Sequence, residues 1–338
     1  MTQQPTQTVR VAFYGTGNFA NRTHIPNLLK LEGVQIVALC DANPEALAAT
    51  AARVPGARTY TDAHEMLRRE ALDALYSCVP AYVRTDVEIA AAQRGIHLFS
   101  EKPQALEMGL AKRIDAAIRQ AGVISTVGFR ERYRPIFRQA RAFLADKAVA
   151  HVRFIMVLKL PRPQPGKASW YQVLEKSGGT ALDWGVHAVD YVRFMTGLDI
   201  VKAQAFYCQR PAYPLPLSSS FHFLLSNGAP MTMDFIATLG EAGRGWGFDF
   251  TIFYEGGTLH LGDYERLEVD GQEIYHGEAF DPWFEHDRLF IEAVRRGDPS
   301  LLVNDYHDGL YSLAPVLAGW ESARRGGETL DLATFMGP

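Results

Sequence analysis

A glycine-rich turn near the N-terminus is the feature that most restricts the fold of this chain. The apolar run Val9–Tyr14 leads into a segment of the pattern G-x-G-x-x-A, formed by Gly15, Thr16, Gly17, Asn18, Phe19 and Ala20. Gly15 permits a tight turn, Gly17 allows a pyrophosphate to approach the backbone, and the alanine allows a helix to pack closely on the strand. A helix is expected over residues 19–31, kinked or shortened at Pro26. The strand before and the helix after the pattern favour a dinucleotide-binding turn over a plain connection.

A carboxylate follows the second expected strand. This strand covers residues 34–40 and ends at Asp41, which lies 24 residues beyond Gly17. A carboxylate in this place accepts hydrogen bonds from the ribose hydroxyls of the adenosine half and repels a 2′-phosphate. The next residues are Ala42, Asn43 and Pro44, with no arginine to receive such a phosphate. The chain is therefore expected to bind NAD, with NADP less favoured.

Strand and helix patterns alternate as far as residue 127. Helices are expected over residues 44–53, 63–69, 87–94 and 105–121, and strands over residues 74–79, 96–100 and 124–127. This alternation predicts a doubly wound parallel sheet, whose ligands lie at the carboxyl ends of the strands. Lys102 follows such an end and is expected near the nicotinamide, and its bond to Pro103 is one that can be cis. The expected cofactor-binding residues are Gly15, Thr16, Gly17, Asn18, Phe19, Asp41, Pro80, Glu101 and Lys102.

From residue 128 onward the pattern changes to a helix and then many strand-like runs. The helix is expected over residues 135–145, and the strands over residues 149–160, 201–207, 219–225, 230–238, 248–254, 258–261 and 266–269. Strands gathered in this way indicate an α+β domain with a large, open, mostly antiparallel sheet. We therefore expect an α/β protein of two domains, a Rossmann NAD(P)-binding domain over residues 1–127 and a substrate-binding and oligomerisation domain over residues 128–338.

An apolar helix in the second domain carries Asp183 and His187. A spacing of four places both side chains on one face of the helix. A carboxylate beside an imidazole is suited to proton transfer near neutral pH. Asp190, three residues further on, either orients the ring of His187 or caps polar surface. Candidates for lining the substrate pocket are Arg130, Trp170 and Tyr171, although such aromatic residues also fit a core or an interface.

Composition excludes several classes of protein. The chain has 338 residues, of which 47% are hydrophobic and 21% charged, as in ordinary globular proteins. A net charge of −4, without a cluster of basic residues, argues against binding to nucleic acid. No apolar run approaches the roughly 18 residues that a membrane span needs. The polar residues 1–8 lack the apolar core of a signal peptide.

Cysteine and histidine spacing adds two further expectations. Cys40, Cys78 and Cys208 are odd in number and widely separated, which indicates reduced thiols and a cytoplasmic protein. The histidines other than His187 show no ligand spacing, so no metal site is expected.

Several motifs together resemble the Gfo/Idh/MocA family, that is, glucose-fructose oxidoreductase, inositol dehydrogenase and their relatives. They are the glycine-rich turn, Glu101-Lys102-Pro103, the crossover Gly128 to Pro135, the segment Gly178 to Asp190, and the closing runs 290–294, 308–310 and 321–323. In such proteins the lysine of Glu-Lys-Pro acts with an aspartate and a histidine of the later helix. The resemblance therefore implies Lys102, Asp183 and His187 as catalytic residues. These three are also expected to contact the substrate, with Arg130 and Trp170 as the further candidates named above.

One segment departs from the family pattern. Members often have Thr-Pro-Asn with a histidine three residues later, whereas this chain has Val79, Pro80 and Ala81 followed by Arg84. A contact on the nicotinamide side is therefore expected to differ, without affecting the catalytic trio.

The expected activity is hydride transfer between NAD and a secondary hydroxyl or ketone of a small sugar, polyol or related hydroxylated metabolite. Two other classes remain open. One is a non-catalytic NAD(P)-binding regulator on the same fold. The other is a redox-neutral lyase or glycosidase that retains its NAD. The second sheet also predicts a homodimer or homotetramer, because an apolar outer face needs a partner.

Overall fold

The computed structural model describes residues 8–162, 169–240, 247–262 and 264–337. These residues form two compact units. The first comprises the described residues up to Arg130 together with Asp281–Leu310, and the second comprises those of Glu131–Phe280 and Tyr311–Pro338. The chain thus first passes from one unit to the other after Arg130, three residues beyond the boundary expected after residue 127. Residues 281–310, which the sequence analysis assigns to the second domain, lie in the first unit.

A parallel sheet forms the centre of the first unit. Among the described residues it has six strands in the order β3-β2-β1-β4-β5-β6, as expected for a doubly wound fold. The strands are β1 (Val9–Tyr14), β2 (Val34–Cys40), β3 (Arg58–Tyr60), β4 (Ala74–Ser77), β5 (His97–Ser100) and β6 (Ser125–Val127). The helices are α1 (Asn18–Arg22), α2 (His24–Leu28), α3 (Pro44–Ala51), α4 (Ala63–Arg69), α5 (Val87–Gln93), α6 (Met108–Ala121) and α10 (Pro282–Arg296). The strands and helices expected in this unit are confirmed within a few residues, with one exception.

The exception is the single helix expected over residues 19–31. The chain instead forms α1 and α2, separated at Thr23, which has non-helical dihedral angles. Proline has no N–H, so Pro26 cannot donate to the carbonyl of Arg22, and a continuous helix would lose a hydrogen bond here. The kink expected at Pro26 is therefore a full break.

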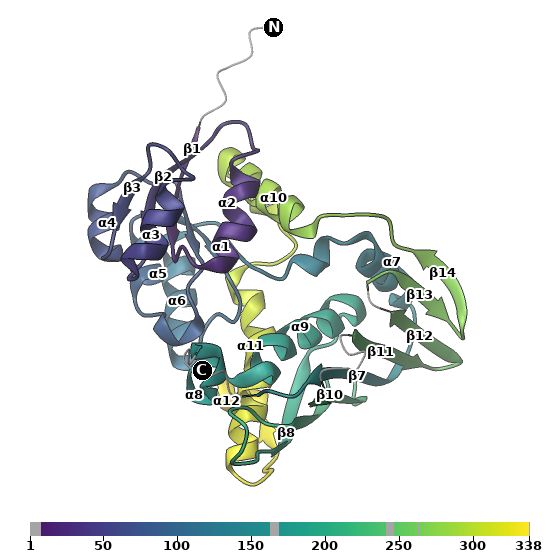
Figure 1. The fold of residues 1–338 in the computed structure, drawn as a ribbon. Coiled ribbons are helices and arrows are strands. Elements are labelled where there is room, and N and C mark those ends of the chain that lie inside the picture. The colour runs from purple at the N-terminus through teal and green to yellow at the C-terminus, as the bar shows by residue number, and fades with distance from the viewer. Residues whose placement is uncertain (1–7, 163–168, 241–246, 263, 338) are drawn as a thin grey trace, which may run out of the picture. The chain divides into compact units, whose positions relative to one another are not determined.

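Aromatic packing explains why α10 belongs to the first unit. Tyr76 of β4 stacks on Phe99 of β5 with ring centroids 4.7 Å apart. Phe290 of α10 meets both rings edge-on, at 5.6 Å and 5.5 Å. All three side chains are fully buried, and Figure 1 shows α10 beside α2. The returning segment therefore completes this hydrophobic core.

A mixed sheet forms the centre of the second unit. Among the described residues it has nine strands in the order β14-β13-β12-β11-β7-β10-β9-β8-β15. Only the pair β7 and β10 is parallel among the pairings described, so the expected open and mostly antiparallel sheet is confirmed. The strands are β7 (Val149–Lys159), β8 (Ile200–Cys208), β9 (Ser218–Leu225), β10 (Pro230–Leu239), β11 (Gly247–Tyr254), β12 (Gly257–Gly262), β13 (Arg266–Val269), β14 (Gln272–His276) and β15 (Leu330–Asp331).

Helices cover one face of this sheet. They are α7 (Pro135–Leu144), α9 (Gly179–Thr196) and the part of α11 (Tyr306–Arg324) that lies in this unit, with the short α8 (Leu174–Ser177) and α12 (Leu332–Met336) beside them (Figure 1). A Cβ on Gly185 of α9 would lie 3.2 Å from Met233 of β10 and from Val316 of α11. The two helices therefore pack closely on the sheet and on each other. Alternate residues such as Ile155 and Ile236, which point to the other face, are half-buried.

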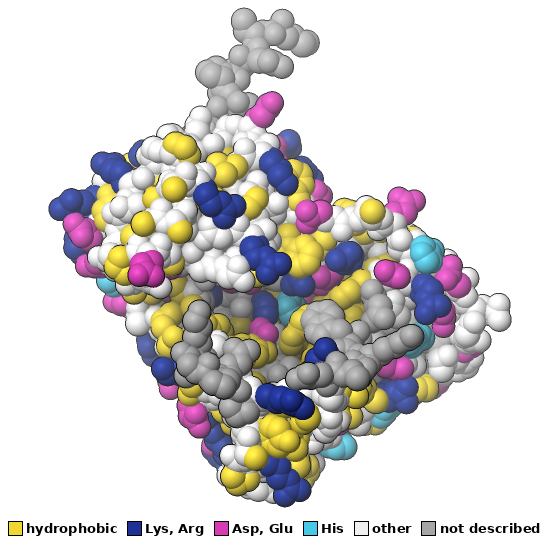
Figure 2. All heavy atoms as spheres, in the orientation of Figure 1, with side chains coloured by type: hydrophobic (Ala, Val, Ile, Leu, Met, Phe, Trp, Pro, Cys, Tyr) yellow, Lys and Arg dark blue, Asp and Glu magenta, His cyan; other side chains and the backbone are white. Residues whose placement is uncertain are grey.

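Surface charge agrees with the composition. On the face that Figure 2 shows, acidic and basic side chains are interspersed and form no extended basic area. Within the part of the chain that the structure describes, no helix is long and apolar enough to span a membrane.

The contact of α11 with the sheet gives a testable prediction. A Cβ on Gly319 would lie 2.4 Å from the ring of Phe221 and 3.5 Å from Ala205. Gly319→Ala should therefore lower the free energy of unfolding by about 1–3 kcal/mol, as overpacking does. Urea denaturation measures this change.

Gly109→Ala is the matched control. Gly109 is also helical, but its Cβ would approach only the Arg113 side chain, at 3.8 Å. This substitution should leave stability unchanged or raise it by up to about 1 kcal/mol, because alanine favours helix. Equal losses in both variants would contradict the packing described here.

Candidate functional site

The glycine-rich turn has the geometry that its pattern predicts. Gly15 has φ +95°, and a Cβ there would lie 2.8 Å from Val79 and 2.9 Å from the main chain of Cys78. A Cβ on Gly17 would meet no atom within 4 Å. The backbone at Gly17 is therefore open to an approaching group, while Gly15 packs closely against the residues that follow β4.

Asp41 lies against this turn. Its Oδ2 accepts hydrogen bonds from the main-chain N–H of Thr16 (2.7 Å) and from the Thr16 hydroxyl (3.1 Å). Its Oδ1 accepts one from the N–H of Asn43 (2.9 Å). These contacts fix the carboxylate at the end of β2, beside the turn.

The carboxyl ends of neighbouring strands bring the expected cofactor-binding residues together. The strands β2, β1, β4 and β5 are adjacent and parallel. Asp41 follows β2, Gly15 follows β1, Pro80 comes shortly after β4, and Glu101 and Lys102 follow β5. All of them therefore lie at one edge of one sheet, where such folds bind ligands.

The segment after β5 is anchored at its backbone. The N–H of Glu101 donates to the carbonyl of Ser77 (2.9 Å), and the N–H of Lys102 donates to Glu101 Oε2 (3.1 Å). A Cβ on Gly128 would lie 2.5 Å from Glu101 Oε1, so the carboxylate packs directly on the Gly128 backbone. The bond between Lys102 and Pro103 is cis.

A buried ionic network holds the side chain of Glu101. His24 Nε2 lies 3.1 Å from Glu101 Oε1, and His24 Nδ1 lies 2.7 Å from Asp287 Oδ1. Asn27 Nδ2 donates to Asp287 Oδ2 (2.9 Å). Burial alone would lower the pKa of His24, but the charges and hydrogen bonds of Asp287 and Glu101 outweigh it and raise the pKa to about 10. His24 is therefore a buried imidazolium at neutral pH.

Sequence reasoning missed this network. It treated His24 as a histidine without ligand spacing and did not single out Asp287. The two residues are separated by 263 positions, so no local pattern connects them. The signal available was a pair of polar residues among the buried side chains of each helix, His24 and Asn27 on α2 and His286 and Asp287 on α10.

In the second unit, α9 carries Asp183 and His187 one turn apart, as the spacing predicts. His187 is buried, and its ring lies 5.8 Å from that of Trp184 and 5.9 Å from that of Tyr191. Asp183 is half-buried. Its Oδ2 accepts a hydrogen bond from the hydroxyl of Tyr171 (3.3 Å).

Tyr171 acts as a neutral donor. Burial raises the pKa of its hydroxyl, and the charge of Asp183 raises it further. The neighbouring Trp170 is exposed to 39% and meets Tyr171 edge-on, with ring centroids 5.8 Å apart.

Arg130, the remaining candidate for substrate contact, lies in the first unit. Its guanidinium lies 4.2 Å from the ring centre of Trp283.

Asp190 forms an ion pair within the second unit. Both of its oxygens accept hydrogen bonds from Arg132, at 2.6–3.1 Å, and Oδ1 also accepts one from the Ser312 hydroxyl (3.0 Å). All three residues are buried. These contacts link α9 to the segment before α7 through Arg132 and to α11 through Ser312.

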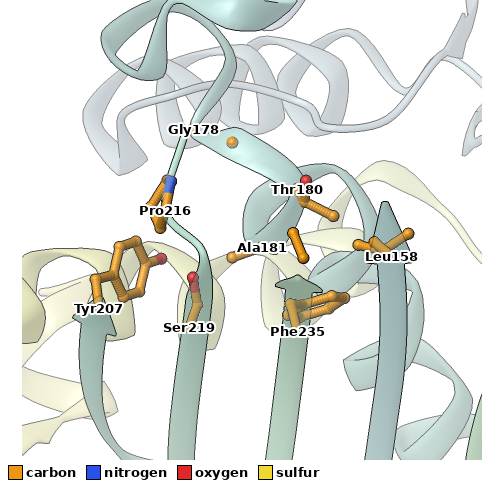
Figure 3. Close-up of a pocket in the computed structure, with 10 residues that line it drawn as sticks. Leu158, Gly178, Thr180, Ala181, Tyr207, Pro216, Ser219 and Phe235 are labelled. Carbon is orange, nitrogen blue, oxygen red and sulfur yellow. The ribbon is translucent and has the colours of Figure 1, made fainter. Parts of the chain in front are cut away.

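A small pocket lies at the N-terminal end of α9, where β7 and β10 end (Figure 3). Thr180 and Ala181 of the helix face Phe235 and Leu158 of the strands, and the ring of Tyr207 lies at its side. Neither Asp183 nor His187 is among its lining residues. The pocket therefore does not mark the place of the expected chemistry.

Among the described residues, no group of three or more acidic, histidine or cysteine side chains is arranged to hold a metal ion.

A parallel sheet with this turn, and with a carboxylate at the end of β2, defines a dinucleotide-binding protein. Comparison with known families gives the same result. Residues 9–129 match the model of the oxidoreductase family with an NAD-binding Rossmann fold, and residues 137–260 match the GFO/IDH/MocA C-terminal domain. The chain belongs to the Gfo/Idh/MocA family of oxidoreductases, as its motifs indicate.

Individual relatives are distant. Myo-inositol 2-dehydrogenase of Thermotoga maritima is 23% identical, and the match covers 57% of this chain and 56% of that protein. The chain thus spans little more than half of this relative. The 4-carboxy-2-hydroxymuconate-6-semialdehyde dehydrogenase of a Sphingobium species is 28% identical over 86% of this chain and 91% of its own. The structure of the WlbA dehydrogenase of Bordetella pertussis, in complex with NADH and UDP-GlcNAcA, superposes with a TM-score of 0.82 at 23% identity, over 96% of this chain and 98% of that one.

The His24 network predicts a pH dependence of stability. Because the pKa of His24 is higher in the folded state than its usual 6.5, its contribution is complete below about pH 6.5 and is lost as the pH rises toward 10. Each pH unit in this window should remove up to about 1.4 kcal/mol. His24→Gln should abolish this slope between about pH 6.5 and 8, a range below that in which the buried thiols Cys40 and Cys78 ionise on unfolding. Urea denaturation at several pH values in this range measures the slope.

His64→Gln is the control for this experiment. His64 pairs with Asp86 at 3.1 Å, but both side chains are exposed, so its loss should leave the slope intact. A slope that survives in His24→Gln would show that His24 is not the titrating group.

Asp41 gives a prediction on cofactor preference. Asp41→Asn keeps an oxygen for the Thr16 N–H but removes the charge that repels a 2′-phosphate. The ratio of the dissociation constants for NADP and NAD should fall by about tenfold or more, equivalent to about 1.4 kcal/mol. Calorimetric titration with both cofactors measures it.

Thr16→Val serves as the matched variant. It removes only the hydroxyl contact to Asp41 (3.1 Å) and leaves the charge in place. The preference should stay as in the native protein. If Asp41→Asn also leaves the ratio unchanged, Asp41 does not decide between the two cofactors.

Proposed function

We propose that this protein is an NAD-dependent oxidoreductase that transfers a hydride between the nicotinamide and a secondary hydroxyl or ketone of a sugar, polyol or related hydroxylated metabolite. The observation that carries the proposal is the combination of an NAD-binding Rossmann domain with Lys102 at the end of β5 and an acid–base pair on α9. The myo-inositol dehydrogenase among its relatives supports the substrate class.

The first unit provides residues that fit NAD. Gly15 and Gly17, with Thr16, Asn18 and Phe19, form the turn and the start of α1, which we assign to the pyrophosphate. We assign Asp41 to the adenosine ribose, and Pro80, Glu101 and Lys102 to the nicotinamide side. The open space at Gly17 supports this assignment, because a backbone without a neighbouring side chain leaves room for the phosphates.

Lys102, Asp183 and His187 are assigned the chemistry. When bound, NAD supplies the acceptor or donor of the hydride. His187 takes the proton of the substrate hydroxyl as general base. Lys102 donates a hydrogen bond to the same oxygen and stabilises the negative charge that develops on it. Asp183 orients the substrate or His187, and Tyr171 fixes the position of its carboxylate.

We assign substrate recognition to Arg130 and Trp170, in addition to these three residues. We propose that the first unit binds the cofactor, and that the second unit binds the substrate and forms the contacts of a homodimer or homotetramer through the nine-stranded sheet. Half-buried apolar side chains on its outer face, such as Ile155, Val157 and Ile236, support that interface. The three cysteines are free thiols, which supports a cytoplasmic location.

The proposal predicts NADH formation that depends on Lys102. The purified protein is given NAD and a panel of polyols, sugars, sugar acids and carboxylated semialdehydes, the last because one relative acts on a semialdehyde. Lys102→Ala and His187→Ala should each reduce turnover by about a hundredfold or more, the usual contribution of a positioned acid or base. Absorbance at the NADH band measures the rate.

Lys30→Ala is the control, because Lys30 is an exposed lysine of the same unit, and it should keep full turnover. Full turnover in Lys102→Ala would overturn the assignment of Lys102. Tight NAD binding without turnover on any compound would favour a regulator. Product formed without net NADH would favour a redox-neutral lyase or glycosidase.

A further inference from the structure

The segment that carries Lys102 is supported from inside the first unit by a residue without an assigned role. Arg84 lies between β4 and α5, in the place where the family often has a histidine. Its side chain has no solvent exposure. A fully buried guanidinium needs acceptors for its donors. Apart from Glu88 of α5, the acceptors of Arg84 lie at the ends of β4 and β5.

The guanidinium joins these two strand ends. Nη1 donates to the hydroxyls of Ser77 (3.1 Å) and Ser100 (2.8 Å), which are paired across β4 and β5. Nη2 donates to the carbonyl of Glu101. That carbonyl belongs to the peptide group whose nitrogen is that of Lys102. Arg84 therefore holds the last main-chain group before the expected catalytic lysine.

A buried partner neutralises the charge of Arg84. Glu88 lies one turn further on, also has no exposure, and its Oε1 is 2.8 Å from Arg84 Nη1. The same oxygen accepts a hydrogen bond from the Ser77 hydroxyl (2.6 Å). The pair is thus neutral, and Arg84 can remain charged without water.

Glu101 is consequently fixed at two points. Arg84 holds its main-chain carbonyl, and His24 holds its carboxylate (3.1 Å). With both ends of the residue fixed, the direction in which the chain leaves β5 is determined, and with it the starting point of the Lys102 side chain.

We propose that Arg84 is a positioning residue for Lys102, acting through the carbonyl of Glu101 and the two serine hydroxyls. This role rests on the proposed function of Lys102. A lysine at position 84 has one ammonium on a flexible chain and cannot span the serines and the carbonyl as the planar fork of arginine does. Lysine therefore replaces the charge but not the geometry.

The test must separate positioning from stability. Arg84→Met alone leaves Glu88 buried without a cation and is expected to destabilise the fold. The double variant Arg84→Met/Glu88→Met removes the charge pair and should keep the melting temperature near that of the native protein, because apolar pairs replace buried ion pairs well. It still removes the anchor of the Glu101 carbonyl. Arg84→Lys is the conservative companion.

Two measurements test the proposal: hydrogen exchange reports on the main chain around Glu101, and steady-state kinetics report on the effect on turnover. Hydrogen exchange, read by mass spectrometry in a peptide over residues 98–106, should be at least tenfold faster at Glu101 and Lys102 in the double variant. On a substrate found in the panel, kcat should fall at least tenfold while KM changes less than threefold. Arg84→Lys should show the same pattern in weaker form.

Arg295→Met/Glu292→Met is the matched control, since it removes a partly buried ion pair on α10 (2.9 Å) in the same unit. It should change neither readout. Native exchange in the folded double variant, or native kcat despite faster exchange, would overturn the proposal. If the native protein turns over no compound, the proposed function fails separately, and exchange alone then decides whether Arg84 anchors this segment.

Discussion

Two carboxylates of the first unit, those of Asp287 and Glu101, are buried and face the same imidazole ring. An isolated buried carboxylate is costly, and a positive charge between the two is what makes their burial tolerable. His24 provides that charge, with one ring nitrogen for each carboxylate. His24 lies on α2, Asp287 on α10 and Glu101 at the end of β5. These contacts therefore hold α2 against segments that lie 77 and 263 positions further along the chain. The placement of Lys102 depends on this contact.

The second unit positions its proposed catalytic residues differently. Asp183 and His187 are fixed by the periodicity of one helix, and α9 is in turn fixed by the ion pair of Asp190 with Arg132. Aromatic rings of Trp184 and Tyr191 flank His187, which limits the orientations of its ring. A side chain on a long, buried helix needs little further support. A side chain on a loop after a strand, as in the first unit, needs a network.

Local patterns explain which parts of this structure could be predicted. The turn at Gly15, the strand ends and the spacing of Asp183 and His187 each depend on residues close in sequence, and the structure has them as expected. The helix break at Thr23 was underestimated, because the effect of a proline on a helix depends on packing as well as on the lost hydrogen bond. The short strands β3, β14 and β15 are not predicted, because they are largely polar and exposed, whereas the equally short β6 is fully buried. The return of residues 281–310 to the first unit depends on the packing of Phe290 against Tyr76 and Phe99. These partners are far away in the sequence, so no local pattern encodes the contact.

Arg84, which stands where the family often has a histidine, has a different role in the structure from the one that the sequence indicates. From the sequence, arginine in place of histidine indicates an altered contact on the nicotinamide side. In the structure its guanidinium is inside the unit and donates to strand ends and to a carbonyl. A cation of this size is tolerated there only because Glu88 lies one turn away with matching charge and equal burial. The two positions are therefore constrained together: a neutral residue at either one leaves the other charge without compensation. The difference from the family pattern thus concerns the internal support of Lys102.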